Sequence, residues 1–369
     1  MSTSIEQAPA VDAEAVRLAQ EFYDERGWTD GLPVTPVTES SLADVLATTS
    51  REPDEVLFEV PHLNRRITVR LAAINAALAG CRPEYFPVVV AAWLAIAKEP
   101  HPRRGIWQST TGTAPLTVVN GPIRTELGLN GAGNVFGSGH RANATIGRAI
   151  RLGLINVFGL RPHELDQATQ GTPAKYTACI AENEELSPWA PLHTEHGHDA
   201  GDSVVTEFVI RSVMHVEARH TSSPEQLARD FADSIRRTGA LIHEYTSALL
   251  VLVPEHARLF ADAGWSKDDL RAFLFAHTRR NRAELTAVGK DALSHKSHWR
   301  LPADHPDAMP DTASATATPD DVALLSFPTS VQIMVAGADN AGVSAIVEVF
   351  TLNPPREIPL STQAVDIRH

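Results

Sequence analysis

The chain has 369 residues, of which 43% are hydrophobic and 21% are charged, a balance that excludes an intrinsically disordered protein. Its formal net charge of −13 argues against a nucleic-acid partner, because phosphate backbones select basic surfaces. A chain of this length is expected to form one large domain or two intimately packed ones.

Targeting and membrane signals are weak along the chain. Residues 1–10 lack the basic and apolar regions of a signal peptide and are expected to form a disordered tail. The most apolar stretch, Tyr85–Ala97, is interrupted by Pro87 and is too short to cross a bilayer, so no membrane partner is expected. Cys81 and Cys179 show neither disulfide nor metal spacing, which favours a cytoplasmic protein.

Hydrophobic periodicity predicts helices that alternate with strands. Helices are expected at 11–26, 39–48, 71–79, 83–98, 142–157, 224–237, directly after Pro254, and at 270–277. Strands are expected at 56–60, 66–70, 116–119, 175–181, 204–213, 248–253, 331–335 and 344–350. The predicted fold is α/β, with a mixed sheet and helices packed around it. We expect residues 11–300 to form the α/β catalytic core, 301–320 an exposed connector, and 321–369 a C-terminal strand pair that completes the core.

Polar chemistry is concentrated between Thr169 and His198. Glu182 and Glu185 follow the predicted strand, at the position where α/β enzymes place catalytic groups, and a desolvated carboxyl there can act as an acid or base. Lys175 and Tyr176 are expected at the start of that strand, where they could orient a substrate or stabilise developing negative charge. A salt-bridged surface turn is the alternative for this Glu-rich segment.

A glycine-rich loop, Gly128–Gly139, leads into the predicted helix at 142–157. Glycines allow close approach of a ligand, and a helix N-terminus favours anions. We therefore predict that Arg141, Asn143 and Thr145, with Asn120 after the preceding strand, bind an anionic substrate. The loop has no Walker lysine and no dinucleotide fingerprint, so no nucleotide cofactor is expected. A mobile loop followed by a capped helix is the alternative.

His193, Glu195, His215 and His220 combine imidazole and carboxylate ligands, which suit Zn, Fe or Mn. They form the predicted divalent-metal set, and a polar loop is the alternative. Asp30 and His256 could also reach the site, although turn and helix-cap roles are more typical of such positions. Cys179 is either a nucleophile or a small buried hydrophobic residue.

Six segments together resemble the large chains associated with the UGSC-type (seleno)protein family. They are GWTDGLP at 27–33, VNGPI at 119–123, RANATIGRA at 141–149, TQGTPAKYTACIAENEELSPWAPLH at 169–193, LVLVPEHA at 250–257 and GWSK at 264–267. The U-G-S-C motif itself is absent. The resemblance implies an enzyme or enzyme subunit linked to thiol or selenol redox chemistry. It also implies that His193, Glu195, His215 and His220 recur in the family.

These patterns predict a soluble enzyme, a lyase or hydrolase, that acts on a small anionic metabolite by acid–base chemistry with metal assistance. The expected partners are the small-molecule substrate and either further copies of the chain or a companion subunit. Two alternatives remain: a non-catalytic ligand-binding subunit of a larger complex, and a thiol- or selenol-linked reductase component, which would require Cys179.

Overall fold

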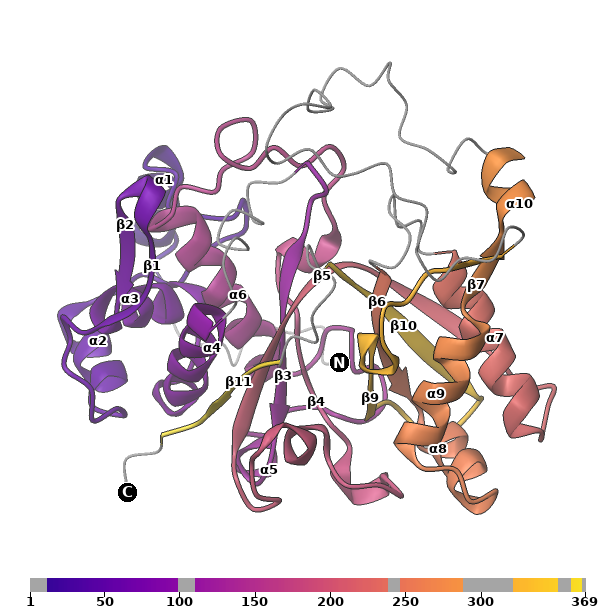
Figure 1. Ribbon diagram of the computed structural model, residues 1–369. Helices are drawn as coiled ribbons and strands as arrows, with labels where there is room; N and C mark the ends of the chain where they lie inside the picture. Colours follow the sequence, from indigo (N-terminus) through magenta and orange to yellow (C-terminus); the bar gives the residue numbers. More distant parts are fainter. Residues whose placement is uncertain (1–11, 99–109, 238–245, 288–320, 351–359, 367–369) are drawn as a thin grey trace.

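A computed structural model of the protein describes residues 12–98, 110–237, 246–287, 321–350 and 360–366 (Figure 1). The predicted tail at 1–10 and the predicted connector at 301–320 lie outside the described residues. A mixed sheet crosses the middle of the molecule, and helices form a group at each end of it (Figure 1).

The first helical group packs against one half of the sheet. It contains α1 (Ala13–Glu25), α2 (Glu39–Leu46), α3 (Val69–Ala79), α4 (Phe86–Lys98) and α6 (Arg141–Asn156), beside the hairpin of β1 (Val56–Val60) and β2 (Arg65–Thr68). Trp93 of α4 is fully buried and lies 6.2 Å from the ring of Phe58 and 5.9 Å from that of Phe158. α3 and α4 are apolar on nearly every side, which is the pattern of helices buried inside a domain.

The central sheet has the order β4-β3-β5-β10-β6-β9. Its strands are β3 (Ala114–Asn120), β4 (Cys179–Ala181), β5 (Val204–Glu217), β6 (Thr246–Leu252), β9 (Val331–Val335), β10 (Val343–Phe350) and β11 (Ser361–Ala364). The β3–β4 and β6–β9 pairs are parallel, and the other pairs are antiparallel. β5 pairs with β3 along one edge and with both β10 and β11 along the other.

The second helical group covers the half of the sheet that contains β6, β9 and β10. It consists of α7 (Pro224–Arg236), α8 (Pro254–Asp262) and α9 (Lys267–His277). Phe231 and Phe260 from these helices are fully buried against Leu250 and Ile333 of the sheet. A short pair, β7 (Arg279–Asn281) with β8 (Asp321–Ala323), and the helices α5 (Ile123–Glu126) and α10 (Arg282–Ala287) complete the α-helices and β-strands of the described residues.

The predicted α/β class with a mixed sheet and surrounding helices is confirmed. The two C-terminal strands do not pair with each other: β9 lies beside β6, and β10 lies between β5 and β6. One local prediction is wrong, because Lys175 and Tyr176 do not begin a strand. Pro173 instead starts a short 3₁₀ turn, Pro173–Lys175, and β4 begins four residues after Lys175, at Cys179.

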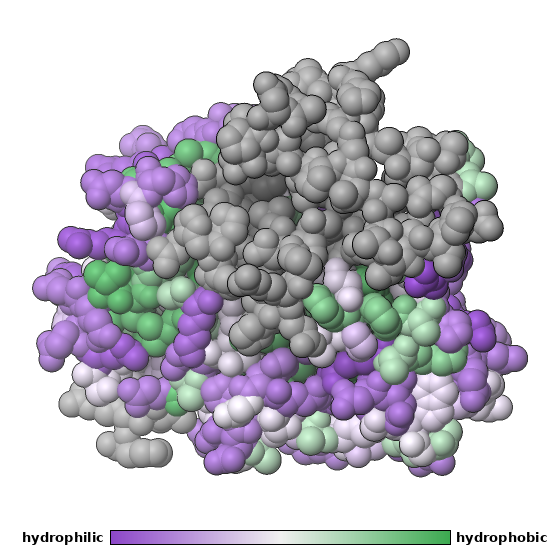
Figure 2. Space-filling view, viewed as in Figure 1, coloured by the Kyte–Doolittle hydropathy of each residue, from purple (hydrophilic) through white to green (hydrophobic). Residues whose placement is uncertain are grey.

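Hydrophilic residues surround smaller hydrophobic patches on the described part of the face in Figure 2, a distribution that fits the acidic composition of the chain. No helix within the described residues is long and apolar enough to cross a membrane.

Candidate functional site

A cavity of about 750 Å³ lies between the turn that follows α1 and the segment that leads into β4. The first side contributes Asp24, Gly27, Thr29, Asp30 and Gly31. The second side contributes residues from the end of α6 and from the segment after it, which are Arg151, Ile155, Arg161, Pro162, His163, Asp166, Ala168, Gln170, Gly171, Thr172, Pro173, Lys175 and Tyr176. The cavity therefore joins two of the segments singled out in the sequence, GWTDGLP and TQGTPAKY.

One carboxylate in the cavity wall binds two cationic side chains. Lys175 Nζ donates to both oxygens of Asp166, at 2.7 and 2.6 Å, and Arg151 Nη2 donates to Asp166 Oδ2 at 3.2 Å. The side chains of Asp166, Arg151 and Lys175 are 3%, 10% and 15% exposed. Their local geometry is set by α6, which carries Arg151, and by the 3₁₀ turn that ends at Lys175.

Burial and mutual charge shift the pKa values of this cluster. Burial disfavours ionisation of Asp166, but the hydrogen bond and charge of Lys175, the Ala168 N–H and the charge of Arg151 hold its pKa below the usual range. Burial lowers the pKa of Lys175; Asp166 opposes this shift and Arg151 reinforces it. Burial also lowers the pKa of Arg151. Lys175 and Arg151 both donate to Asp166 and both have a lowered pKa, but arginine stays protonated in proteins, so Lys175 is the cation of this cluster that can become neutral.

Asp30 forms a second ion pair at the cavity. Arg148 of α6 donates to both of its oxygens at 2.8 Å, and the Asp30 side chain is only 3% exposed. Arg148 also donates to the carbonyls of Leu32 and Pro33, so it joins α6 to the turn after α1. Asp30 thus lies in the cavity wall, and its Oδ1 also accepts the Leu32 N–H at 3.2 Å, which is a turn role.

Arg161 and Tyr176 present less engaged groups to the same cavity. One Arg161 amino group donates to the Gly27 carbonyl at 3.2 Å, whereas its buried Nε has no partner within the described residues. Tyr176 is 51% exposed. His163 has φ +68°, a left-handed conformation that residues other than glycine rarely adopt, and such strain is often found at functional sites.

The charged side chains of the lining balance: Arg151, Arg161 and Lys175 are cationic, and Asp24, Asp30 and Asp166 are anionic. Arg151 and Lys175 pair with Asp166, and Arg148, which lies outside the lining, pairs with Asp30, whereas Asp24 stands at the exposed rim. Arg161, which forms no ion pair within the described residues, is therefore the cation of the lining that an anionic ligand could pair with.

The predicted acid–base residue Glu182 lies elsewhere, fully buried at the end of β4. Its Oε2 accepts hydrogen bonds from Asn120 Nδ2 at 2.6 Å and from the Leu192 N–H at 2.8 Å. Its Oε1 accepts one from the Val335 N–H at 3.3 Å. Burial raises the pKa of Glu182, and the charge of Lys267 and these donors oppose the shift. Both oxygens are thus engaged in joining β3, β4 and β9.

The predicted base Glu185 forms an ion pair rather than lining the cavity. Arg124 Nη2 lies 3.0 Å from Glu185 Oε1 and 2.9 Å from Glu184 Oε2. The Arg124 hydrogen bond, opposed by desolvation, lowers the pKa of Glu185. For Glu185 this arrangement matches the alternative of a salt-bridged turn.

The four predicted anion-binding residues do not face one common ligand site. Asn120 binds Glu182 and Glu184, and Asn143 is buried with hydrogen bonds to the backbone of Asn130 and Cys179. Arg141 is exposed and donates to the Gly80 carbonyl, and the Thr145 hydroxyl donates to the Arg141 carbonyl. Their hydrogen bonds are those of a helix start packed against a loop, and none of the four lines the cavity.

The predicted metal ligands are not assembled either. Within the described residues, no group of three or more His, Cys, Asp or Glu side chains is arranged to hold a metal ion. Glu195 is paired with Lys267 Nζ at 2.7 Å and with Arg271, and His193 Nε2 lies 3.0 Å from the Asp199 carbonyl oxygen. His215 and His220 are exposed along and after β5, and His215 lines a separate, mainly apolar cavity of about 380 Å³. These donors do not fit the expected metal.

His256, the other histidine that could have reached the site, is buried in the second helical group. Its Nε2 lies 3.1 Å from the Ala218 carbonyl, which can only accept, so Nε2 carries the proton. Its Nδ1 therefore accepts the Ser344 hydroxyl at 2.8 Å, and Ser344 Oγ in turn accepts the Val253 N–H at 3.2 Å. His256 is a neutral structural residue.

Ser344→Ala is expected to lower the free energy of unfolding by about 2 kcal/mol, because His256 Nδ1 and the buried Val253 N–H both lose their hydrogen-bond partner. Burial lowers the pKa of His256, so the unfolded chain binds its proton more readily and stability falls as pH drops below 6.5. Urea titrations at several pH values measure both effects. Ser40→Ala, at an exposed position of α2, is the control; equal losses in the two variants would contradict the assignment.

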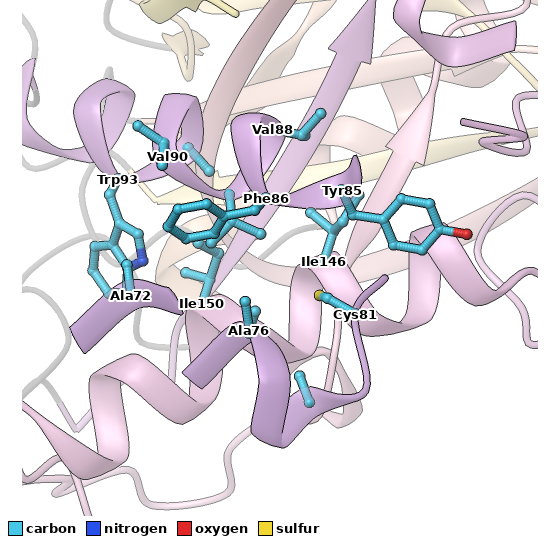
Figure 3. Close-up of a cluster of buried hydrophobic side chains, with 14 of the residues drawn as sticks. Ala72, Ala76, Cys81, Tyr85, Phe86, Val88, Val90, Trp93, Ile146 and Ile150 are labelled. Carbon is cyan, nitrogen blue, oxygen red and sulfur yellow. The ribbon is translucent and has the colours of Figure 1, made fainter. Parts of the chain in front are cut away.

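Both cysteines are free and buried. Cys81 lies among Ala76, Tyr85 and Ile146 in the core (Figure 3), and burial raises the pKa of its thiol to about 12. Burial, with the nearby Glu207 and Cys81, also raises the pKa of Cys179 well above its usual value. Thiols that stay protonated are poor nucleophiles, so the geometry favours the buried-hydrophobe alternative for Cys179.

No known protein-family model matches the chain, and no significantly similar curated protein is found. The case for a functional site therefore rests on the cavity itself. Of the residues predicted to act in catalysis, the cavity contains Lys175 and Tyr176.

The sequence interpretation missed Arg151, Arg161 and Asp166. A usable signal existed for Arg151, which lies in the apolar run Ala149–Ile155 of α6. A buried arginine in such a run requires a counter-charge, which predicts a nearby carboxylate. Periodicity alone does not indicate which acidic residue supplies it.

Proposed function

We propose that the protein is an enzyme that acts on a small anionic metabolite by acid–base chemistry in the 750 Å³ cavity. The observation that carries the proposal is the Arg151–Asp166–Lys175 cluster in its wall. A cavity of this size suits a metabolite, and a few converging polar groups in its wall would orient that ligand.

Lys175 is the proposed proton-transfer group, because burial lowers its pKa and so makes its proton easier to transfer. Asp166 orients the amine through both of its oxygens, and Arg151 keeps Asp166 ionised. Arg161 would bind the anionic group of the substrate, and the exposed Tyr176 phenol could donate a hydrogen bond to it. A lyase or hydrolase reaction suits such a set of groups.

Binding of small anions tests the proposal directly. Oxalate and inorganic phosphate are titrated into the protein by calorimetry, and Arg161→Gln is expected to weaken binding of the anion that binds best by about tenfold, the loss of one charge-assisted hydrogen bond. Arg219→Gln, at an exposed arginine after β5, is the matched control and should bind normally. If neither anion binds, or if both variants bind like the parent protein, the cavity is not an anion site.

A turnover screen then separates an enzyme from a ligand-binding subunit. Small carboxylates and phosphate esters are incubated with the protein, and Lys175→Met is expected to retain anion binding within a few fold while losing turnover by at least about a hundredfold. Binding without turnover of any compound that binds in the cavity would favour the non-catalytic subunit.

A further inference from the structure

Lysine is rare in this chain. Of its 32 basic residues only five are lysines, so arginine supplies nearly all the positive charge. Among the described residues, Lys98 donates to the Thr362 carbonyl and Lys267 to the Ala190 carbonyl and Glu195, whereas Lys175 lines the 750 Å³ cavity. Arginine stays protonated in proteins, but lysine can become a free amine.

Charge alone does not explain a lysine at position 175. Arg151 already provides Asp166 with a cationic partner, and Asp30 shows that this protein pairs a buried carboxylate at the cavity with an arginine. What Lys175 adds to the cavity is an amine that can become a nucleophile. Burial and the neighbouring Arg151 both favour loss of its proton, which is the usual way in which lysine nucleophiles are activated.

We propose that Lys175 forms an imine with a small carbonyl compound that carries an anionic group, of the 2-oxo acid class. This inference rests on the proposed function, because the same cavity must first bind the anion. The Lys175 Nζ attacks the carbonyl carbon, a C–N bond forms, and the carbonyl oxygen leaves as water. The lysine ammonium has three N–H protons and the protonated imine one, so the two protons lost leave with that water, and no oxidant or reductant is needed.

The charge balance of the cavity suits this step. The protonated imine keeps the single positive charge of the lysine, so Asp166 retains its ion-pair partner throughout. Arg161, which lines the cavity and uses one amino group to bind the Gly27 carbonyl, would bind the carboxylate next to the carbonyl. A protonated imine withdraws electrons from the neighbouring carbon, and this property would let the same site cleave bonds or remove protons beside the carbonyl group.

Reductive trapping tests the proposal. The protein is incubated with glyoxylate and sodium cyanoborohydride, which reduces a protonated imine to a stable secondary amine, and modified peptides are mapped by mass spectrometry. Lys175 is expected to react at least about ten times faster than Lys98, since a lowered pKa raises the free-amine fraction. Lys175→Arg should lose this fast modification, and Lys98→Arg should keep it. Modification spread evenly over the lysines, or slowest at Lys175, overturns the proposal.

Two further measurements distinguish imine formation at Lys175 from anion binding in the cavity. Oxalate, which is an anion but not an aldehyde or ketone, should slow trapping at Lys175 and leave trapping at Lys98 unchanged. If oxalate binds with the expected dependence on Arg161 but Lys175 is not trapped, the imine is wrong and the anion-binding function stands. If oxalate and phosphate fail to bind and Lys175 is not selectively trapped, both proposals fail.

Discussion

Asp166→Asn is expected to lower the free energy of unfolding by about 3–5 kcal/mol, the cost of removing one partner from a buried ion pair. The substitution leaves Arg151 and Lys175 close together with no counter-charge between them. It should also lower the pKa of Lys175 further, because Asp166 is the group that raises it. Urea unfolding measures the first effect, and the pH dependence of cyanoborohydride trapping at Lys175 measures the second.

Two variants make this result decisive. Asp24→Asn removes a carboxylate from the exposed rim of the same cavity and should cost less than about 0.5 kcal/mol. The double variant Asp166→Asn/Lys175→Met should regain part of the lost stability, because only one uncompensated cation remains. If Asp166→Asn is as stable as Asp24→Asn, the cluster is not a buried ion pair.

Acid titration of the parent protein provides an independent check on Asp166. Its folded pKa is lowered, so the folded state binds a proton less readily than the unfolded chain. The stabilisation from Asp166 is therefore complete above its ordinary pKa of 3.8 and is lost as pH falls through the folded value. Asp166→Asn should lack this component of the pH dependence.

Glu182→Gln is expected to be destabilising by about 2–4 kcal/mol, although the two side chains have nearly the same shape. Each Glu182 oxygen accepts at least one N–H donor, from Asn120 and Leu192 on one side and from Val335 on the other. Glutamine replaces one of these oxygens with an NH₂ group, which would then face donors. Glu126→Gln, at an exposed position of α5, is the matched control and should have little effect.

Glu182 also gives the stability of the parent protein a pH dependence that Glu182→Gln should lack. Because the folded pKa of Glu182 is raised, the folded state binds a proton more readily than the unfolded chain. This contribution to stability is complete below 4.5 and declines as pH rises through the folded pKa, so the free energy of unfolding falls over that window. Urea titrations across the window should show this decline in the parent protein and not in Glu182→Gln; parallel curves would show that the pKa of Glu182 is not raised.

Elements defined by local patterns were predictable from the sequence. Alternating or continuous apolar runs predicted β5, β6 and β10, and helical periodicity predicted α7 and α9. The strand prediction fails around Lys175 because Thr, Tyr and Cys favour strands, whereas Pro173 starts a 3₁₀ turn.

The candidate site was only partly predictable, for a physical reason. The polar segment predicted Lys175 and Tyr176 as site residues. It did not predict Arg151 of α6 and Asp166 of the segment after it, which set the charge environment of Lys175. Pairing of charges depends on tertiary packing, which periodicity does not encode. Glu182 and Glu185 stood out equally, yet the fold uses one as a buried hydrogen-bond acceptor and the other in an ion pair.

The position of β10 has a consequence for how the chain folds during its synthesis. Residues 343–350 lie between β5, which ends at residue 217, and β6, which ends at residue 252. During synthesis on the ribosome, both neighbours emerge long before the strand that separates them. Until β10 arrives, each has an unpaired hydrogen-bonding edge, the kind of edge that promotes aggregation. Nascent chains stalled before residue 343 should therefore need chaperone protection, and release of the complete strand should end that dependence.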